Sequence, residues 1–255
     1  MVNLGLIGKT LGHSWSADYF AEKFRAEDID GTYSLFQLPE IDRLPDLISQ
    51  NPELNGLNVT IPYKESVMEY IDICSPDARA IGAVNVIKIT HSDDGKPIME
   101  GYNSDWEAFR ESIRPLCEGK NFTALILGTG GAAKAVAYAL QSLGTQSRLV
   151  SREKHPGDSG ILCYGELTDE DIRGNKIIVN ATPLGMHPLT DTFPDIPYEG
   201  ITSEHICHDL VYNPEQTEFM RRCASHGAIV KNGLEMLHRQ ADISWEIWKR
   251  NRPIQ

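Results

Sequence analysis

A buried strand that runs directly into a glycine-rich turn is the feature that most constrains the fold of this chain. The apolar run 123–127 leads into Gly128-Thr129-Gly130-Gly131-Ala132, and an Ala- and Leu-rich helical segment follows as far as Gly144. Glycine permits a tight turn and lets the backbone approach a pyrophosphate, whose charge is favoured at a helix N-terminus. The turn therefore predicts dinucleotide binding, although its spacing differs from the usual G-x-G-x-x-G. A plain strand-to-helix turn is the alternative.

The next predicted strand, 147–150, ends where the ribose of a dinucleotide would be recognised. An NAD site typically has an acidic residue here, about 20 residues beyond the glycines, to bind the ribose 2′-hydroxyl. This chain instead has Ser151, Arg152 and Lys154, and the planar guanidinium of Arg152 suits a 2′-phosphate. These residues favour NADP. Glu153 would oppose a phosphate if it pointed inward, and two solvated loop cations are the alternative interpretation.

Short apolar strands alternate with helical patterns along the chain, which predicts parallel βαβ units and an α/β fold. We predict strands at residues 4–7, 33–38, 57–61, 84–89, 123–127, 147–150, 176–180 and 206–210, and helices at 16–26, 106–113, 132–143 and 233–249. The helix 106–113 is expected to break near Pro115 and to link two domains. The first would comprise residues 1–102, completed by a C-terminal helix 234–255, and the second residues 103–233.

Composition limits the partners that this chain can bind. Its 24 Lys and Arg against 36 Asp and Glu give a net charge of −12 with no basic stripe, which argues against nucleic acid and anionic membranes. We see no apolar run near the ~20 residues of a membrane span and no secretory signal. Five cysteines without CxxC spacing suit a reducing cytoplasm. The cluster of His205, Cys207, His208 and Asp209 could suggest metal ligands, but its apolar neighbours favour a buried strand.

Polar residues stand beside the predicted strands of the first half. Ser14 and Ser16 lie between a strand and a helix, where they could bind a carboxylate or where Ser16 could be an N-cap. Lys64 follows a strand terminus, where ligand crevices lie in open α/β sheets, although an isolated lysine is often a solvated surface group. Asn85 interrupts an apolar strand and needs hydrogen-bond partners if buried. Asp105 opens the linking helix, where it could be an N-cap.

Taken together, the motifs resemble the shikimate dehydrogenase family. They occur in family order from residue 6 to residue 240: Leu6-Ile7-Gly8 with His13-Ser14-Trp15-Ser16, Gly56-Leu57-Asn58-Val59-Thr60-Ile61-Pro62-Tyr63-Lys64, Gly82-Ala83-Val84-Asn85, Gly101-Tyr102-Asn103-Ser104-Asp105, Gly128-Thr129-Gly130-Gly131-Ala132, Asn180-Ala181-Thr182-Pro183-Leu184-Gly185-Met186, Asp209-Leu210-Val211-Tyr212-Asn213-Pro214, and Gly233-Leu234-Glu235-Met236-Leu237 with Gln240. Among the departures, Ser104 replaces a usual threonine and Ser151 a usual asparagine.

The resemblance implies an N-terminal α/β substrate domain with a mostly parallel sheet, a Rossmann-like NADP-binding domain, and a cleft between them. It implies the reversible NADPH-dependent reduction of 3-dehydroshikimate to shikimate in aromatic amino acid biosynthesis. Residue by residue, it implies that Ser14 and Ser16 hold the substrate carboxylate, that Thr60, Asn85, Asp105 and Gln240 bind ring hydroxyls, and that Tyr212 lies near the substrate. It further implies that Gly128, Thr129, Gly130, Gly131, Ala132, Ser151, Arg152 and Lys154 bind NADP, with Leu210 and Gly233 touching the nicotinamide side through their backbone.

The resemblance makes Lys64 and Asp105 the catalytic pair, and the required chemistry agrees. Hydride arriving at a ketone carbon creates an alkoxide, which needs a positioned proton donor or a cation. Lys64 supplies that proton and charge, so no metal is expected. Alternatives are a quinate/shikimate dehydrogenase that uses NAD, a non-catalytic sensor of the metabolite, and a fold relative acting on a folate or aminoacyl substrate. We expect a cytoplasmic monomer or homodimer.

Overall fold

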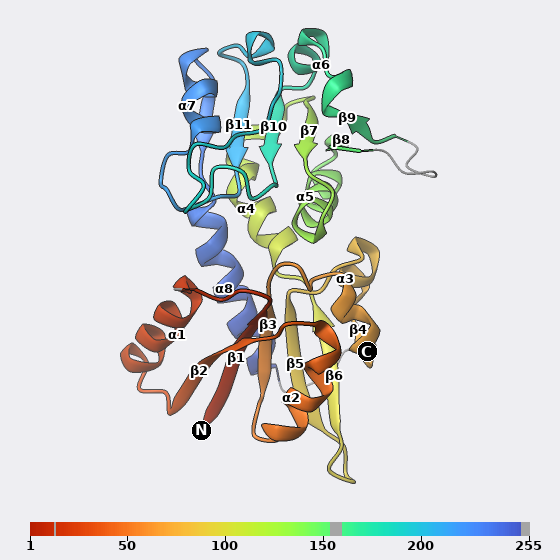
Figure 1. Ribbon diagram of the computed structural model, residues 1–255, viewed down its shortest axis with the longest axis vertical. Helices are drawn as coiled ribbons and strands as arrows, with labels where there is room; N and C mark the ends of the chain where they lie inside the picture. Colours follow the sequence, from red (N-terminus) through yellow and green to blue (C-terminus); the bar gives the residue numbers. More distant parts are fainter. Residues whose placement is uncertain (13, 154–159, 251–255) are drawn as a thin grey trace. The chain divides into compact units, whose positions relative to one another are not determined.

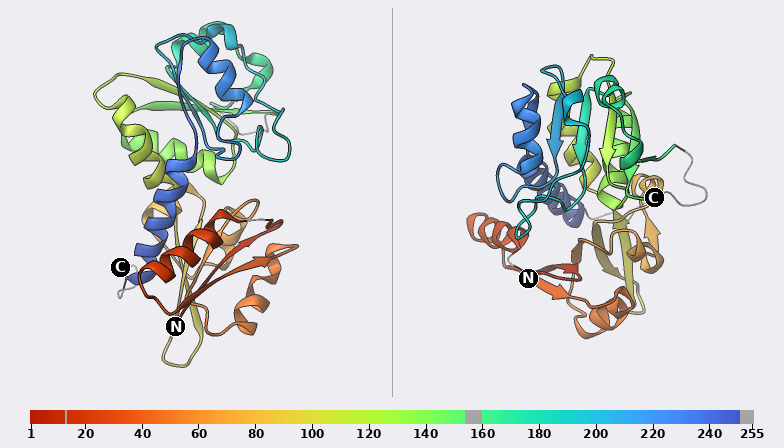
Figure 2. Two further views of the ribbon diagram at one scale, coloured as in Figure 1. Left: turned by 90° about the vertical axis from the view of Figure 1, so that its left-hand side faces the viewer. Right: turned by 45° about the horizontal axis from the view of Figure 1, so that its top comes forward.

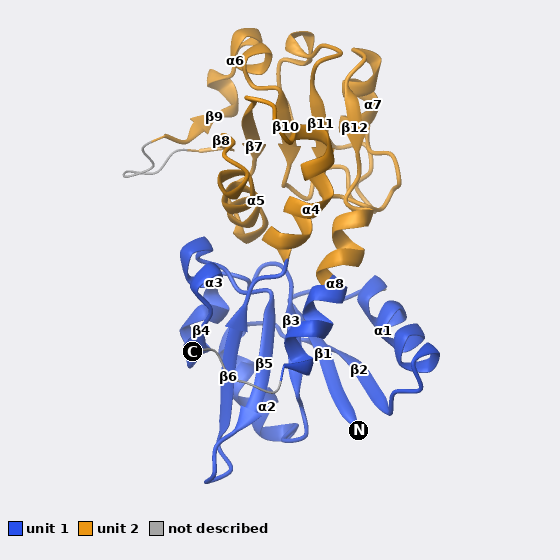
Figure 3. Cartoon of the chain, turned by 180° about the vertical axis from the view of Figure 1, so that it is seen from behind, with its two compact units in different colours: residues 1–104, 241–255 blue, residues 105–240 orange. Residues whose placement is uncertain are grey.

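The computed structural model describes residues 1–12, 14–153 and 160–250, which belong to two compact units (Figures 1 and 3). The first unit is Met1–Ser104 with Ala241–Gln255, and the second is Asp105–Gln240. Within the described residues, each unit has its own six-stranded sheet. The prediction of an α/β fold is confirmed. None of the described helices is long and apolar enough to cross a membrane.

The first unit is built on a mixed sheet in the order β2-β1-β3-β5-β6-β4. Its strands are β1 Val2–Gly8, β2 Gly31–Gln37, β3 Gly56–Val59, β4 Ile73–Cys74, β5 Val86–His91 and β6 Pro97–Tyr102. Its helices are α1 Trp15–Ala26, α2 Leu44–Gln50 and α3 Pro76–Ile81, with short 3-10 turns at Ile41–Arg43 and Ser66–Tyr70. Strand β1 pairs in parallel with β2 and β3, and β4 with β6, whereas β5 is antiparallel to β3 and β6.

The register of this sheet gathers several chain segments at one of its ends. Ile7 pairs with Val59, so β1 and β3 end side by side. Asn58 pairs with Val86, and Val86 with Tyr102, so β5 begins where β3 and β6 end. The loops after β1, β3 and β6 and the residue before β5 therefore share one end of the sheet, despite the mixed strand directions.

Helices cover both faces of this sheet. On one face, Leu57 and Ile87 pack with Leu44 and Ile48 of α2. On the other, Leu4 and Val86 pack with aromatic side chains of α1 and of α8 (Leu234–Lys249). Trp248 of α8 donates to the backbone oxygen of Ile87 at 2.9 Å, and a Cβ at Gly56 would lie 2.2 Å from its indole nitrogen. A glycine is therefore required at this position for α8 to pack so closely.

The second unit is a doubly wound parallel sheet in the order β12-β11-β10-β7-β8-β9. Its strands are β7 Thr123–Leu127, β8 Gln146–Ser151, β9 Leu162–Cys163, β10 Ile177–Asn180, β11 Ile206–Asp209 and β12 Ile229–Lys231. Its helices are α4 Asp105–Cys117, α5 Gly131–Ser142, α6 Asp169–Gly174 and α7 Glu218–Ser225, with 3-10 turns at Tyr164–Glu166 and Tyr198–Gly200. Counted from β7, this is the Rossmann order 3-2-1-4-5-6 read backwards, with its switch point between β7 and β10.

Helices also cover both faces of the second sheet (Figure 2). Leu125 and Cys207 point to the face where Phe219 of α7 and Ile172 of α6 pack. The next residue after Cys207, His208, faces the other way and stacks on Phe109 of α4. Burial on both faces explains why the central strands β7 and β10 read as mostly apolar runs in the sequence.

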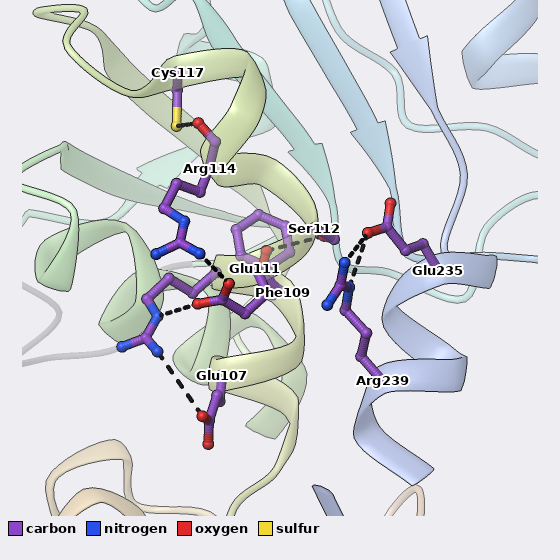
Figure 4. A network of polar contacts seen from close by, with 9 residues as sticks. Glu107, Phe109, Glu111, Ser112, Arg114, Cys117, Glu235 and Arg239 are labelled. Atoms are coloured by element: carbon purple, nitrogen blue, oxygen red, sulfur yellow. Dashed lines mark hydrogen bonds and ion pairs between the residues drawn. The ribbon is translucent and has the colours of Figure 1, made fainter. Parts of the chain in front are cut away.

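Helix α4 corrects one prediction, because it does not break near Pro115 but continues to Cys117. Pro115 removes the backbone donor that would bond to the oxygen of Glu111, and the helix ends two residues after it. The Cys117 thiol donates to the backbone oxygen of Ile113 at 3.5 Å in this last turn. Ion pairs between residues three apart, such as Arg114 with Glu111, support the exposed side of the helix (Figure 4).

Several strand boundaries also differ from the prediction, and two of these differences lie beside candidate site residues. Strand β3 ends at Val59 rather than at residue 61, because Tyr63 bonds back to the backbone of Thr60 in a turn. Strand β5 begins at Val86, so Asn85 precedes the strand instead of lying inside it. The prediction missed a set of short elements, namely α2, α3, α6, α7, β4, β6, β9 and β12.

Candidate active site

The loop that carries Lys64 is fixed by hydrogen bonds on both of its sides. The backbone oxygen of Lys64 accepts from the nitrogen of Val84 at 2.7 Å. The neighbouring Tyr63 is buried, and its hydroxyl donates to the backbone oxygen of Leu38 at 2.7 Å. Because its backbone and its neighbour are both anchored, the half-buried Lys64 is held at the end of the sheet.

The side-chain amide of Asn85 forms hydrogen bonds to Ser104, the residue before Asp105, through both its oxygen and its nitrogen. Its Oδ1 accepts from the backbone nitrogen of Ser104 at 2.7 Å, and its Nδ2 donates to Ser104 Oγ at 3.0 Å. Asn85 is 2% exposed and Ser104 fully buried, so the buried asparagine does find the partners that the sequence demanded. Since a backbone N–H can only donate, the bond to Oδ1 determines which way the amide faces.

Asp105 is a buried residue at the start of a helix. It is the first residue of α4 and is 4% exposed. A carboxylate at this place is favoured by the positive end of the helix dipole. Its position directly after Ser104 means that the bonds from Asn85 also fix where its backbone begins.

Ser14 and Ser16 open helix α1. The cap position belongs to Ser14, so the interpretation of Ser16 as the N-cap is wrong. Within the described part of the chain, the Ser14 hydroxyl makes no capping bond to the helix. The side chain of Ser16 interacts with Tyr33, whose hydroxyl pKa is raised strongly by burial and lowered by this contact.

Thr60 directly follows β3. Its backbone nitrogen donates to Ile7 at 2.9 Å, and a Cβ at Gly8 would lie 2.7 Å from its methyl group. The register described above, with the bond from Val84 to Lys64, brings three of the predicted residues to one end of the first sheet: Thr60, Lys64 and Asn85. Ser14 and Ser16 follow the loop that leaves β1 at this end. Asp105 follows the sixth strand at the same end.

Tyr212 and Gln240 belong to the second unit. Tyr212 is half-buried in the segment after β11, and burial raises the pKa of its hydroxyl. Gln240 lies in the middle of α8 and is half-buried.

The glycine turn after β7 has the geometry that a phosphate needs. Gly128 has a φ of 120°, a conformation that only glycine adopts readily, and a Cβ there would lie 3.2 Å from the oxygen of Ala181. Gly130 occupies the N-cap of α5 and has no side chain with which to cap the first N–H groups of that helix. Gly131 and Ala132 start the helix, and its first turn carries no acidic residue. This end of α5 can accept an anion.

Leu210 and Gly233 are brought into direct contact by the fold. A Cβ at Gly233 would lie only 2.1 Å from the backbone oxygen of Leu210. The nitrogen of Gly233 also donates to the oxygen of Val211 at 3.0 Å. The two residues predicted to contact the nicotinamide through their backbone therefore lie side by side, and a side chain at residue 233 would push the backbone of Leu210 away.

Asp209 organises the loops around Leu210. Its carboxylate accepts from Thr217 Oγ1 at 2.6 Å, from Asn180 Nδ2 at 3.0 Å and from the backbone nitrogen of Val211 at 3.0 Å. Burial raises its pKa to about 6, although these three donors oppose the shift. The strand interpretation of residues 206–209 is confirmed, and among the described residues no group of three or more His, Cys, Asp or Glu is placed to hold a metal ion.

The end of β8 presents the residues that would distinguish NADP from NAD. Ser151 ends the strand, and Arg152 follows it on the surface. Arg152 lies close enough to Tyr164 to lower its hydroxyl pKa against burial, which raises that pKa to about 12. Glu153 is exposed, so nothing forces its charge toward a ligand. Lys154 lies outside the described residues.

Sequence reasoning missed the buried partners of the predicted residues, above all Ser244 of α8. Ser244 Oγ accepts from Asn58 Nδ2 at 3.0 Å and lies 3.3 Å from Ser104 Oγ. Ser244 is fully buried in α8, and no motif in the sequence marks it for this role.

Comparison with known proteins places the chain in a family. The family profile described as "Shikimate dehydrogenase substrate binding domain" matches residues 6–87. A protein of Desulforamulus reducens named "Shikimate dehydrogenase (NADP(+))" is 36% identical over 96% of this chain and 88% of its own length. The chain belongs to the shikimate dehydrogenase family.

Solved structures agree with this assignment. The crystal structure of shikimate dehydrogenase 1 from Peptoclostridium difficile is 34% identical, covers 98% of this chain and 92% of its own, and has a TM-score of 0.81. That of shikimate 5-dehydrogenase from Thermus thermophilus in complex with NADP(H) and shikimate is 29% identical, covers 99% and 95%, and has a TM-score of 0.83. The resemblance drawn from the motifs is confirmed.

Proposed function

We propose that this chain is an NADP-dependent shikimate dehydrogenase, which reduces 3-dehydroshikimate to shikimate reversibly in aromatic amino acid biosynthesis. The observation that carries the proposal is its similarity, over 96% of its length, to a curated enzyme of that name. The position of Thr60, Lys64 and Asn85 at one end of the first sheet supports it, because the resemblance assigns these residues to the substrate site.

The first unit is proposed to bind the substrate, with Asp105, Tyr212 and Gln240 contributed by the second unit, which binds NADP. The first unit, to which the substrate-domain profile matches, binds the substrate. Ser14 and Ser16, in the first turn of α1, hold its carboxylate; the ring hydroxyls are bound by Thr60, Asn85, Asp105 and Gln240, with Tyr212 nearby. The second unit binds NADP, with its pyrophosphate at the glycine turn and its 2′-phosphate at Ser151, Arg152 and Lys154.

The residues fit this cofactor in two respects. The uncapped N–H groups of α5 follow Gly130, and the close contact between Gly233 and Leu210 leaves backbone, rather than a side chain, to face the nicotinamide. When bound, NADPH supplies the hydride that reduces the ketone carbon.

Lys64 is proposed to complete the reduction as a general acid. As the ketone oxygen gains negative charge, the ammonium of Lys64 donates a proton to it and becomes a neutral amine, which solvent then reprotonates. In the oxidation direction the neutral amine takes the proton back from the hydroxyl. The carboxylate of Asp105 orients the ammonium and one substrate hydroxyl.

The experiment that tests the proposal measures the reduction of NADP+ at 340 nm with shikimate. We expect turnover with shikimate and NADP+ that exceeds turnover with quinate and NAD+. Equal or better rates with quinate and NAD+ would instead establish the quinate/shikimate enzyme. Binding of shikimate without any turnover would establish a sensor. Light scattering of the same sample tests the expected monomer or homodimer, and cell fractionation tests the cytoplasmic location.

A further inference from the structure

A continuous chain of buried polar side chains crosses the first unit beneath the predicted substrate residues. Tyr33 of β2 donates to Asn58 Oδ1 at 2.8 Å, and Asn58 Nδ2 donates to Ser244 Oγ at 3.0 Å. The hydroxyls of Ser244 and Ser104 lie 3.3 Å apart, and Ser104 is gripped by Asn85 as described above. We call these five residues the buried polar chain.

Burial makes the members of the buried polar chain depend on one another for hydrogen bonds. Asn58 is 5% exposed, Asn85 2%, and both serines are fully buried. A buried polar group that loses its partner has no water to replace it, so each member depends on the next. The amide of Asn58 uses both of its hydrogens, one on Ser244 and the other on the backbone oxygen of Asn85 at 3.3 Å.

Asn85 differs from Asn58 in the number of amide hydrogens that its bonds to the described residues use. Its oxygen is committed to the backbone of Ser104, and one amide hydrogen to the Ser104 hydroxyl. Among the described residues these are the bonds of its amide, which leaves one N–H hydrogen for a ligand. The direction of that hydrogen is set by the plane of the amide, and this plane is set by Ser104.

We propose that Ser104 and Ser244 are positioning residues, whose paired hydroxyls hold the Asn85 amide in the orientation that donates to a substrate hydroxyl. The proposal rests on the function proposed above and goes beyond it, because it assigns a role in substrate recognition to a serine of α8 and to the residue before Asp105. Ser244 acts at a distance through Ser104, and Ser104 acts through both the amide and the backbone.

The test compares kinetics of Ser244→Ala, Ser104→Ala and Ser104→Thr with those of the wild-type chain. We expect each alanine variant to raise KM for shikimate by about tenfold, the equivalent of one misdirected hydrogen bond. KM for NADP+ should change by less than about twofold, since the buried polar chain lies wholly in the first unit. Ser104→Thr keeps the hydroxyl and should restore KM for shikimate to within about threefold of wild type.

Ser112→Ala is the matched control. Ser112 is a buried serine of α4 whose hydroxyl donates to the backbone oxygen of Phe109 at 2.9 Å, outside the buried polar chain (Figure 4). We expect this variant to lose comparable stability but to leave both KM values unchanged. Alanine is the best helix former, so Ser244→Ala keeps α8 intact and carries the test even if Ser104→Ala does not fold.

A double-mutant cycle of Ser104→Ala and Ser244→Ala, measured by urea unfolding, tests the link between the hydroxyls without using activity. Non-additive losses support the pair, and additive losses overturn it. Unchanged KM for shikimate in both alanine variants of an active enzyme, or equal changes for shikimate and NADP+, would overturn the positioning role alone. An inactive wild-type chain would overturn the proposed function and the substrate role of both serines together.

Discussion

The Cβ that any residue other than glycine would carry at position 233 falls 2.1 Å from the backbone oxygen of Leu210. The two residues come from different segments, one after β11 and the other before α8, so this contact fixes the path of both. It also presents a surface of bare backbone where the cofactor is proposed to bind.

Gly233→Ala is therefore expected to destabilise the protein by about 1–3 kcal/mol, because the added carbon must displace backbone. It should also raise KM for NADP+. Urea unfolding and steady-state kinetics measure the two effects. Gly174→Ala is the control, since a Cβ there meets no described atom within 4 Å outside its own helix and chain neighbours; it should leave KM for NADP+ unchanged and should not lower stability. A Gly233→Ala protein as stable as this control would contradict the contact.

Arg152→Ala tests the source of cofactor preference. Losing a charge-assisted bond to the 2′-phosphate should raise KM for NADP+ by about 10- to 100-fold. KM for NAD+, which has no such phosphate, should stay the same. Arg148→Ala removes an exposed arginine from β8, the strand that precedes Arg152, and should alter neither value. Equal effects of Arg152→Ala on both cofactors would assign the selectivity elsewhere.

The burial of His208 makes the stability of the protein depend on pH. It is fully buried against Phe109, and neither ring nitrogen has a hydrogen-bond partner among the described residues. Burial, aided by the charge of Lys231, lowers its pKa from 6.5 to about 3. The unfolded chain binds a proton there below pH 6.5 and the folded chain does not, so stability falls as the pH drops from 6.5 to about 3.

Replacing this imidazole should remove that dependence. The stability difference between His208→Leu and wild type should grow in favour of the variant by about 1.4 kcal/mol for each pH unit below 6.5. Urea unfolding at several pH values measures it, and the difference should be constant above about pH 8, where both states are neutral. A difference that stays flat down to pH 4 would show that the ring is not held neutral.

Asp209, the residue after His208, gives the stability of the protein the opposite dependence on pH. Its folded pKa of about 6 exceeds the ordinary value of 3.8, so ionisation opposes folding as the pH rises through this window. In the wild-type protein the two slopes largely cancel between these values. Relative to the double variant His208→Leu/Asp209→Asn, the stability of His208→Leu should therefore decrease from pH 4 to pH 6, and a relative stability that instead rises over this range would contradict the account.

The parallel sheet of the second unit was predictable from the sequence because its strands are buried on both faces. Runs such as 124–127 and 177–179 are continuously apolar, and the glycine turn follows the first of them directly. The two-residue strand β9 and the six-residue helices α3 and α6 could not be found this way. Elements so short have no repeat, and their neighbours in space define them.

The candidate site divides in the same manner. Lys64, Asn85 and Asp105 could be named because motifs carry them, and their polar character conflicts with an apolar setting. Ser244 could not, because its partners Asn58 and Ser104 lie 186 and 140 residues away in the sequence. Hydrogen bonds over such separations are products of the tertiary fold, and no local pattern records them.

The central claim is that the Lys64 ammonium supplies the proton of the reduction. The most direct measurement is the rate of NADP+ reduction by shikimate for Lys64→Ala and for Lys96→Ala, which removes an exposed hairpin lysine paired with Asp94. The account predicts a loss of about 10²- to 10⁴-fold in kcat for Lys64→Ala, little change in its KM for shikimate, and wild-type rates for Lys96→Ala. A Lys64→Ala protein that turns over at the wild-type rate would contradict it.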